Sequence, residues 1–557
     1  MNADKRRSAS IRVIPRQKGY FDLRFEKGNG PMANRSLFKS LRGTLAPVTD
    51  ALNEEQAPAY KLSPKHQLAQ YVATGCLNHT FYASADEQLA KVIELCQEVD
   101  SEFIAKTAVF CRERNHMKDM PALLCAVLSV HDPKLLQQVF PRVIDNAKML
   151  RNFVQIMRSG AVGRKSLGTA PKRLVREWLD ARDPESLFKA SVGQDPSLAD
   201  IVKMVHPRPK NAAQAALFGY FIDRTKQGDE LPELVSAFEA FKKNPSGEVP
   251  NVPFQMLTAL ELGTREWTAI ASQAPWQMTR MNLNTFARHG VFKEKGMTDL
   301  IAERLRDPFK IAKSRVFPYQ LMVAYMAAAG NRDIPVDVTN ALQDAMEIAT
   351  GNVPAFPGKV YVFPDISGSM HSPATGFRQG STSAVRCVDV AALVAATVLR
   401  KNPRAEVIPF ESNVVEVRLN PRDSVMTNAQ KLSHLPCGGT NCSAPLEFLN
   451  RNRADGDLVI YVSDYESWID GPRYGNFGGS ATATMKEWSV FRRRNPGARM
   501  VCIDIQPYGT VQAKERDDIL NIGGFSDQVF SLVSEFASGN LNANHWIGVI
   551  EATDLSM

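Results

Sequence analysis

Short apolar runs alternate with helical runs from residue 359 to residue 505, and this alternation restricts the fold of that region more than any other feature. The apolar runs are rich in Val and Ile and have no regular polar position, which is typical of strands buried on both faces of a parallel sheet. Parallel strands need crossover helices between them. The strand-like runs lie at 359–364, 405–410, 457–463 and 499–505, and the helical runs at 384–401 and 483–494. The sequence therefore predicts a doubly wound α/β domain.

Oxygen-bearing side chains follow these predicted strands. Asp365, Ser367 and Ser369 form an Asp-x-Ser-x-Ser sequence at the end of the first strand. Thr440 follows two glycines in a second loop, and Asp464 directly follows a third strand. Carboxylate and hydroxyl oxygens suit a hard cation such as Mg²⁺, and open α/β sheets place ligands beyond the carboxyl ends of their strands. Asp, Ser and Gly are also common turn residues, but three such loops favour a cation site.

The three loops resemble the metal-ion-dependent adhesion site of the von Willebrand factor A domain family. The resemblance implies that Ser367, Ser369 and Thr440 hold Mg²⁺ directly, while Asp365 and Asp464 act largely through bound water. It also implies one open coordination position, which an acidic group from a partner usually occupies. The expected cofactor is therefore a divalent cation, Mg²⁺, at this site.

Residues 60–350 show no alternation of strand-like and helical runs; instead, sequence windows with a helical pattern follow one another with little interruption. Pro begins several windows and Asp or Asn ends several, as expected of helix pairs joined by short turns. One long window runs from residue 133 to residue 158. The pattern predicts an α-solenoid of the HEAT or armadillo kind, with degenerate repeats because no exact repeat is present.

The net charge is only +8, from 67 Lys and Arg against 59 Asp and Glu, so the distribution of charge matters more than its sum. Residues 151–176 carry seven basic residues and no acidic one. Lys and Arg neutralise phosphates, and an ordinary exposed helix mixes both signs, so we favour RNA contact over a solvated helix face. The predicted contacts there are Arg164, Lys165, Lys172, Arg173 and Arg176, of which the last three can share one helix face.

A second basic segment precedes residue 46, with eleven Lys and Arg against three Asp and Glu. It lacks clear periodicity. Such an arm is either a disordered, solvated tail or a further nucleic-acid contact.

Six stretches follow one another between about residue 60 and residue 370, where the predicted A domain begins. They are "AVFCRERNHMKDMPALLCAVL", "PKRLVREWL", "VKMVHPRP", "WQMTRMNLNTFARHGVF", "SRVFPYQLMVAYM" and "VPAFPGKVYVFPDISGSM". With the A domain that follows them, these stretches resemble the TROVE-domain family of Ro ribonucleoproteins. The match covers the chain almost to its end, and the order and spacing of the stretches make it specific.

The resemblance implies a ring of helical repeats, sealed by contacts with the A domain. Small structured Y RNAs bind the outer face of that ring, and single-stranded 3′ ends of misfolded RNAs enter its central hole. Lys172, Arg173, His206 and Arg208 occupy basic positions of the family pattern. The sequence departs from the pattern at 166–171 and 194–200, so the exact Y-RNA footprint stays open.

Other features narrow the class of protein. The eight cysteines include no CxxC pair, which favours reduced thiols and a cytoplasmic location, although Cys437 and Cys442 leave a disulfide or soft-metal site open. No apolar stretch reaches the length of a membrane span, and the first residues do not resemble a signal peptide. Because no nucleophile with a partner base is visible, we expect no enzyme.

The sequence thus predicts a basic arm at 1–45, a TROVE helical domain at 46–355 and an A-like domain at 356–557. The predicted function is a monomeric RNA-binding ring for RNA quality control or processing. Its expected partners are a small Y-like RNA, misfolded or 3′-tailed RNA, and a 3′ exoribonuclease tethered through the RNA. The alternative is a metal-dependent adaptor that binds protein through the A domain. RNA binding should weaken steeply with salt, whereas a metal-bridged contact should be abolished by chelation.

Overall fold

The structure is a computed structural model that describes residues 46–556 except for short gaps. The gaps lie at 75–79, 225–229, 246–247, 315, 317, 352, 375, 377–384, 470–480, 525–526 and 542–544. Residues 46–557 form one compact unit. The predicted basic arm at 1–45 lies outside the described residues, as does Cys76.

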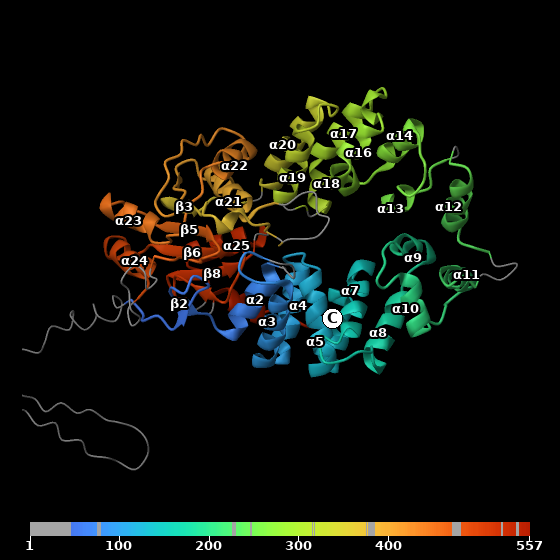
Figure 1. Cartoon of the computed structure of the whole chain (residues 1–557), viewed down its shortest axis with the longest axis horizontal. Helices are drawn as coiled ribbons and strands as arrows, with labels where there is room; N and C mark the ends of the chain where they lie inside the picture. The colour runs from blue at the N-terminus through green and yellow to red at the C-terminus, as the bar shows by residue number, and fades with distance from the viewer. Residues whose placement is uncertain are drawn as a thin grey trace, which may run out of the picture. The chain divides into compact units, whose positions relative to one another are not determined.

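Helices occupy the chain from α2 to α20, as the sequence predicts (Figure 1). Their bounds are α2 Pro64–Thr74, α3 Ala85–Glu98, α4 Ser101–Glu113, α5 Asp119–His131, α6 Pro133–Val143, α7 Ala147–Ser159, α8 Thr169–Asp180, α9 Pro184–Ala190, α10 Leu198–Val205, α11 Ala212–Phe221, α12 Glu233–Lys243, α13 Phe254–Leu257, α14 Thr264–Gln273, α15 Trp276–Met281, α16 Leu283–Arg288, η1 Val291–Lys293, α17 Met297–Arg306, α18 Pro308–Ser314, α19 Pro318–Ala329 and α20 Val336–Ala349.

Local capping explains where these helices begin and end. The Asp132 side chain accepts hydrogen bonds from the first turn of α6, and Pro133 occupies the first helical position. The expected single helix over 133–158 is wrong, because Ile144 ends α6 and Asn146 caps α7 through the amide of Met149. Two separate helices, α6 and α7, replace it, and both pack against α5.

The A domain has a five-stranded parallel sheet in the order β4-β3-β5-β6-β8. Its elements are β3 Val360–Pro364, η2 Ser369–His371, α21 Cys387–Lys401, β4 Glu406–Val407, α22 Val425–Ser433, α23 Ala444–Arg451, β5 Leu458–Ser463, α24 Ala483–Arg494, β6 Arg499–Asp504, β8 Ile519–Gly523, α25 Asp527–Ala537 and α26 His545–Glu551. The strand order reverses at β3, so the crevice between the ends of β3 and β5 is the topological switch point where such sheets bind ligands.

Successive residues of the central strands belong to two separate cores. Val362 and Ile460 face a large cluster that includes α21 and continues into the helical region. Tyr361 and Tyr461 face a smaller cluster that contains the fully buried Trp488 of α24. Both faces of the sheet are therefore covered, as expected of strands without a regular polar position.

A second, three-stranded sheet was not predicted. It consists of β1 Ala51–Leu52, β2 Pro58–Lys61 and β7 Thr510–Val511, in the order β1-β2-β7. Strand β2 pairs antiparallel with β7, so that Tyr60 lies opposite Val511. The segment that precedes the first helix is thus built into the A domain.

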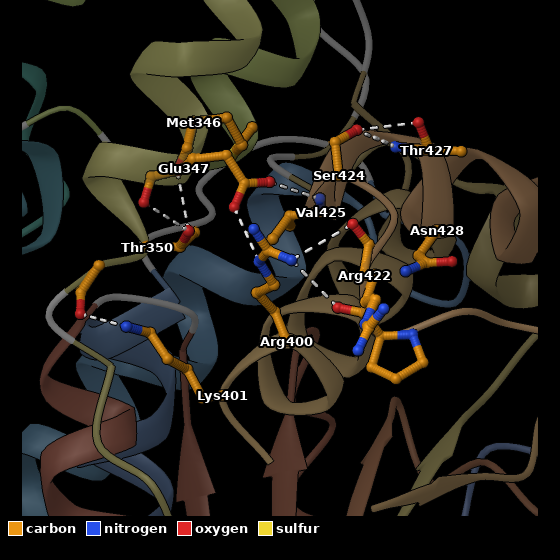
Figure 2. A network of polar contacts seen from close by, with 12 residues as sticks. Met346, Glu347, Thr350, Arg400, Lys401, Arg422, Ser424, Val425, Thr427 and Asn428 are labelled. Carbon is orange, nitrogen blue, oxygen red and sulfur yellow. Dashed lines mark hydrogen bonds and ion pairs between the residues drawn. The ribbon is translucent and has the colours of Figure 1, made fainter. Parts of the chain in front are cut away.

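Both ends of the helical series contact the A domain. At the beginning, His66 Nε2 lies 2.8 Å from the carbonyl oxygen of Asn521 in β8, and Lys65 Nζ lies 2.7 Å from Glu551 in α26. At the end, Glu347 of α20 pairs with Arg400 of α21 (Figure 2). No helix in the described part of the chain is long and apolar enough to cross a membrane.

Candidate functional site

The first loop of the site follows β3 and folds back on its own carboxylate. Asp365 Oδ1 accepts a hydrogen bond from the amide of Ser367 at 2.8 Å, and Oδ2 accepts one from the hydroxyl of Ser463 at 2.5 Å. The Oγ atoms of Ser367 and Ser369 lie 3.4 Å apart. Asp365 and Ser367 are fully buried, and Ser369 is 5% exposed. The turn therefore gathers one carboxylate and two hydroxyls at the end of one strand.

The second loop carries Thr440 and contacts the first loop through its backbone. The amide of Gly368 donates to the carbonyl of Gly438 at 2.9 Å. A Cβ atom at Gly439 would lie 2.4 Å from Trp468 Nε1, so the close approach of the loops requires glycine there. The expectation that this loop also follows a strand is wrong, because it connects α22 to α23. Thr440 is nevertheless buried beside the other loops.

Asp464 belongs to the third loop, directly after β5. Because β3 and β5 are parallel neighbours, with Pro364 opposite Val462, Asp365 and Asp464 emerge at the same edge of the sheet. Both are almost completely buried. The structure therefore brings together the three loops that carry the predicted metal residues, which are Asp365, Ser367, Ser369, Thr440 and Asp464.

The electrostatics of this group fit a cation. Burial raises the pKa of Asp365 to about 7, and the negative charge of Asp464 contributes to the increase. Burial also raises the pKa of Asp464, against a hydrogen bond from Ser369 that lowers it. The pKa values of Glu466 and Asp504 are raised well above their usual range by burial and then by the charge of Asp464. A divalent cation would compensate these crowded carboxylates.

The donor set is rich in hydroxyls and poor in carboxylates. In the part of the chain that the structure describes, no three His, Cys, Asp or Glu side chains meet as a metal-binding group. Two carboxylates with three hydroxyls are oxygen ligands of the kind that Mg²⁺ accepts together with bound water. The site therefore fits the predicted cofactor better than Zn²⁺ or another soft metal.

The disulfide alternative near Thr440 is wrong. Cys437 is exposed and Cys442 is buried, and both are free thiols. Burial raises the pKa of the Cys442 thiol well above its usual range.

The second candidate site is a basic pocket of about 500 Å³ at the start of α8. Its charged lining comes from Arg158, Lys165, Lys172 and Arg176, and its lining contains no acidic side chain. Gly168 precedes α8 with φ 69°, and no side chain caps that helix end. The amides of Thr169 and Ala170, which precede Pro171, and the hydroxyls of Ser166 and Thr169 are available hydrogen-bond donors at this helix end.

The other predicted RNA residues lie outside the lining of this pocket. Arg173 turns away and donates to Gln137 at 2.8 Å, with Glu177 at 3.7 Å. The guanidinium of Arg164 packs near Gly168 at the rim. His206 and Arg208 are exposed just beyond α10. Arg176 of α8 donates a hydrogen bond to the carbonyl of Val205, the last residue of α10, which precedes His206. These last contacts join α8 to the His206 segment.

Sequence reasoning missed Arg158 as a member of the pocket. It lies in the last turn of α7 and within the acid-free stretch 151–176, which is the signal that could have identified it. Arg151, at the other end of that stretch, has a structural role, since its Nη1 donates to the carbonyl of Ala190 at 3.2 Å.

Comparisons with known proteins agree with this architecture. Residues 359–537 match the family model of the Ro60 vWA domain. The chain is 23% identical over 548 residues to the RNA-binding protein RO60 of Deinococcus radiodurans. This alignment covers 91% of this chain and 100% of that protein. It is 24% identical over 419 residues to the RNA-binding protein RO60 of Caenorhabditis elegans, covering 70% of this chain and 61% of that one.

A solved structure shows the same fold. The crystal structure of the Ro (RSR) protein of Deinococcus radiodurans superposes with a TM-score of 0.60 and 20% sequence identity, over 86% of this chain and all of that chain. The predicted fold class, a helical repeat domain followed by a doubly wound A domain, is confirmed. The resemblance to the Ro family is confirmed as well: the chain carries a Ro60 von Willebrand factor A domain behind a helical region with the fold of the Ro protein.

Proposed function

We propose that this chain is a Ro-like RNA-binding protein whose basic pocket at the start of α8 binds backbone phosphates of a small structured RNA. The relatives named RNA-binding protein RO60 support RNA as the class of partner. The observation that carries the proposal is the pocket itself, where Arg158, Lys165, Lys172 and Arg176 line one cavity without an acidic side chain.

Phosphate is the group that such a lining recognises. Four cations around a cavity of about 500 Å³ provide charge, and the free helix end and two hydroxyls provide directed donors. Contacts of this kind position an RNA without reading its bases. A folded RNA fits this role, because its backbone presents phosphates at fixed spacings on a rigid surface.

The test compares two changes on the same helix. Lys172→Ala with Arg176→Ala removes two pocket cations, and should weaken binding of a Y-like stem-loop RNA and reduce the salt slope by about one to two phosphate contacts. Arg173→Ala removes one cation that points toward Gln137 and should leave the slope nearly unchanged. Filter-binding titrations at several salt concentrations measure both. An unaltered slope in the double variant would remove the pocket from the RNA interface.

A second mode of RNA binding follows from the Ro resemblance. We propose that single-stranded 3′ ends of misfolded RNAs enter the central hole of the helical ring, held mainly through backbone charge. The small RNA on the outer face would tether a 3′ exoribonuclease, so that the protein presents defective RNA ends for quality control or processing. Support comes from the Ro fold and from the contacts that the A domain makes with both ends of the helical series.

We also propose that the A domain holds a metal ion, at a site separate from the RNA-binding pocket. Asp365, Ser367, Ser369, Thr440 and Asp464 would hold Mg²⁺, which would neutralise the buried carboxylates and offer one open coordination position. The alternative adaptor function stays a prediction. Chelation of the metal by EDTA distinguishes the two functions. It should abolish a metal-bridged contact with a protein partner, whereas phosphate contacts in the α8 pocket lie on another part of the fold and should persist.

A further inference from the structure

Strand β4 forms one edge of the five-stranded sheet and has β3 as its neighbour. The amide of Ile408 donates to the carbonyl of Val362 in β3 at 2.9 Å. The amide of Phe410 donates to the carbonyl of Pro364, the last residue of β3, at 3.2 Å. Because the backbone groups of successive residues in a strand point to opposite sides, the amide and the carbonyl of Val407 point away from β3. The outer side of β4 therefore offers backbone groups to a further strand.

The segment that follows β4, residues 414–419, turns back along this outer side but pairs with it only at its first residues. Val414 forms an antiparallel bridge with Phe410, and the amide of Val415 donates to the carbonyl of Pro409 at 2.8 Å. Among the described residues, no backbone hydrogen bond joins residues 416–419 to residues 405–410. This returning segment therefore leaves the outer side of Val407 without a paired strand.

A groove of about 560 Å³ is lined by β4 and by the returning segment. Val407 lines it from β4, and Val415, Val417 and Leu419 line it from the returning segment. These last three side chains are half-buried, whereas the residues at 416, 418 and 420 are exposed. Such alternation is typical of a strand with one covered face. An edge strand and a strand-like segment thus border a space that an extended chain can fill.

The charge of this groove is negative. Glu406 and Glu416 belong to its lining, which contains no Lys or Arg among the described residues. Glu406 is half-exposed and pairs with Lys359 at 3.1 Å, so part of its charge is already balanced. Glu416 is exposed on the returning segment. Phe448 of α23 adds an aromatic side chain that is 39% exposed. The lining therefore suits a ligand that carries both apolar and basic side chains.

We propose that this groove is a docking site for an extended peptide segment of a partner protein, in which apolar side chains alternate with Lys or Arg. The segment adds to the sheet beside β4 and bonds to the amide and carbonyl of Val407. Its apolar side chains pack against Val415 and Val417, and its cations pair with Glu416. Backbone bonds provide affinity in this mode of recognition, and the side chains provide specificity. The docking site is separate from RNA binding and from the metal site, because none of the five predicted metal residues lines the groove.

Two variants test the two kinds of contact. Val407→Pro removes an amide that points outward and keeps the bond from Ile408 to β3; proline is accepted on edge strands at such positions. It should weaken peptide binding by about fivefold or more, since one backbone hydrogen bond is lost and the ring blocks the edge. Glu416→Lys reverses the charge of an exposed side chain and should weaken binding by about tenfold or more. Arg418→Gln is the matched control, because Arg418 is exposed on the same segment but lies outside the lining. It should leave the affinity within about twofold of the parent.

The probe is a short fluorescent peptide of alternating Val and Lys, blocked at both ends, and fluorescence anisotropy measures its binding to the full chain at fixed salt. A peptide of alternating Val and Glu should bind at least about tenfold more weakly. EDTA should leave the binding of the Val/Lys peptide unchanged. Thermal unfolding checks that Val407→Pro is folded, and Glu416→Lys tests the groove independently because it changes an exposed side chain.

Four results would overturn the inference. The first is the absence of saturable binding of the Val/Lys peptide, and the second is an equal affinity of the parent and Glu416→Lys for it. Loss of binding on chelation would assign the contact to the metal site instead. Sedimentation of the chain without peptide gives the fourth: a dimer that Val407→Pro dissociates would make a second copy of this chain, rather than a basic partner peptide, the occupant of the edge.

Discussion

Glu347 and Arg400 form an ion pair at 3.2 Å where the last helix of the helical region meets the A domain (Figure 2). The other carboxylate oxygen of Glu347 accepts a hydrogen bond, at 2.7 Å, from the amide of Val425. Val425 is the first residue of α22. Arg400 also donates to the carbonyls of Pro421 and Arg422. One acidic side chain therefore joins the end of α21 to the beginning of α22, and ties both to α20.

Removing Glu347 should loosen this junction. Glu347→Ala loses a half-exposed ion pair, worth about 0.2–1 kcal/mol, and an acceptor for a helix N-terminus, worth about 1 kcal/mol. We expect a loss of roughly 1–2 kcal/mol in the free energy of unfolding, measured by urea denaturation. Glu347→Gln keeps an acceptor for Val425 and should cost less. Strictly additive effects of Glu347→Ala and Arg400→Ala in a double-mutant cycle would contradict the coupling.

Loss of Asp365 should abolish metal binding without unfolding the helical region. Mg²⁺ at about 100 times its Kd should stabilise the parent protein by about 2.7 kcal/mol, because it binds the folded state alone. Asp365→Ala should lose this stabilisation, measured by thermal unfolding and by metal content in mass spectrometry. Ser372→Ala is the control: Ser372 is a buried hydroxyl of the same loop that bonds Gln506 rather than the ligand group. Equal metal content in Asp365→Ala and the parent would show that the site is misassigned.

Acidification should loosen the contact between α2 and the A domain through His66. Burial lowers the pKa of His66 from 6.5 to about 4; the hydrogen bond with the carbonyl of Asn521 opposes this decrease, and the charge of His545 contributes to it. Between pH 6.5 and pH 4, His66 is therefore protonated in the unfolded state but neutral in the folded state. Stability from neutral His66 is complete above pH 6.5 and is lost as the pH falls toward 4, by up to roughly 3 kcal/mol.

The measurement for His66 is the difference in unfolding free energy between the parent and His66→Gln across this pH range. Buried carboxyls act with the opposite sign; burial raises the pKa of Glu515 to about 8, for example. The difference curve removes contributions common to both proteins. A flat difference curve would mean that His66 does not govern the acid sensitivity of this contact.

A free single-stranded 3′ tail should decide whether RNA binds in the proposed hole. A duplex roughly 20 Å across should not enter a passage that admits one strand, so a tailed RNA should bind well and its blunt counterpart poorly. The small structured RNA on the outer face should compete with the tailed one, because the two sites would be neighbours. Mobility-shift titrations at fixed salt test this. Equal binding of blunt and tailed forms would leave only a basic surface.

The central strands of the A domain could be predicted because their apolar runs are long and unbroken. The ends of β3 and β5 therefore placed Asp365 and Asp464 correctly. The short strands β1 and β7 have two residues each, too few for any period to be visible. Strand β8 carries a buried Asn521 in its centre, which interrupts the apolar pattern. Such elements are defined by pairing between distant segments, which a local pattern does not contain.

Helix α8 shows that the sequence pattern also does not fix the direction of every single side chain. Lys172 and Arg176 are four residues apart and share a face, as the 3.6-residue period requires. Arg173 was expected on that face, but it is rotated by about 100° from Lys172 and reaches Gln137 instead. Arg158 joins the pocket from another helix. Only the packing of α7 against neighbouring helices could reveal its place.

The three-stranded sheet makes the order of synthesis matter. The hydrogen bond from Asn53 to Ser467 joins residues 414 positions apart, and at typical rates of elongation the ribosome needs roughly 20 to 80 seconds to cover that distance. During this interval β2 has left the ribosome while β7 does not yet exist, so the edge of β2 that faces away from β1 has no partner strand. The segment 51–61 therefore reaches its final pairing only after residues 510 and 511 have been made.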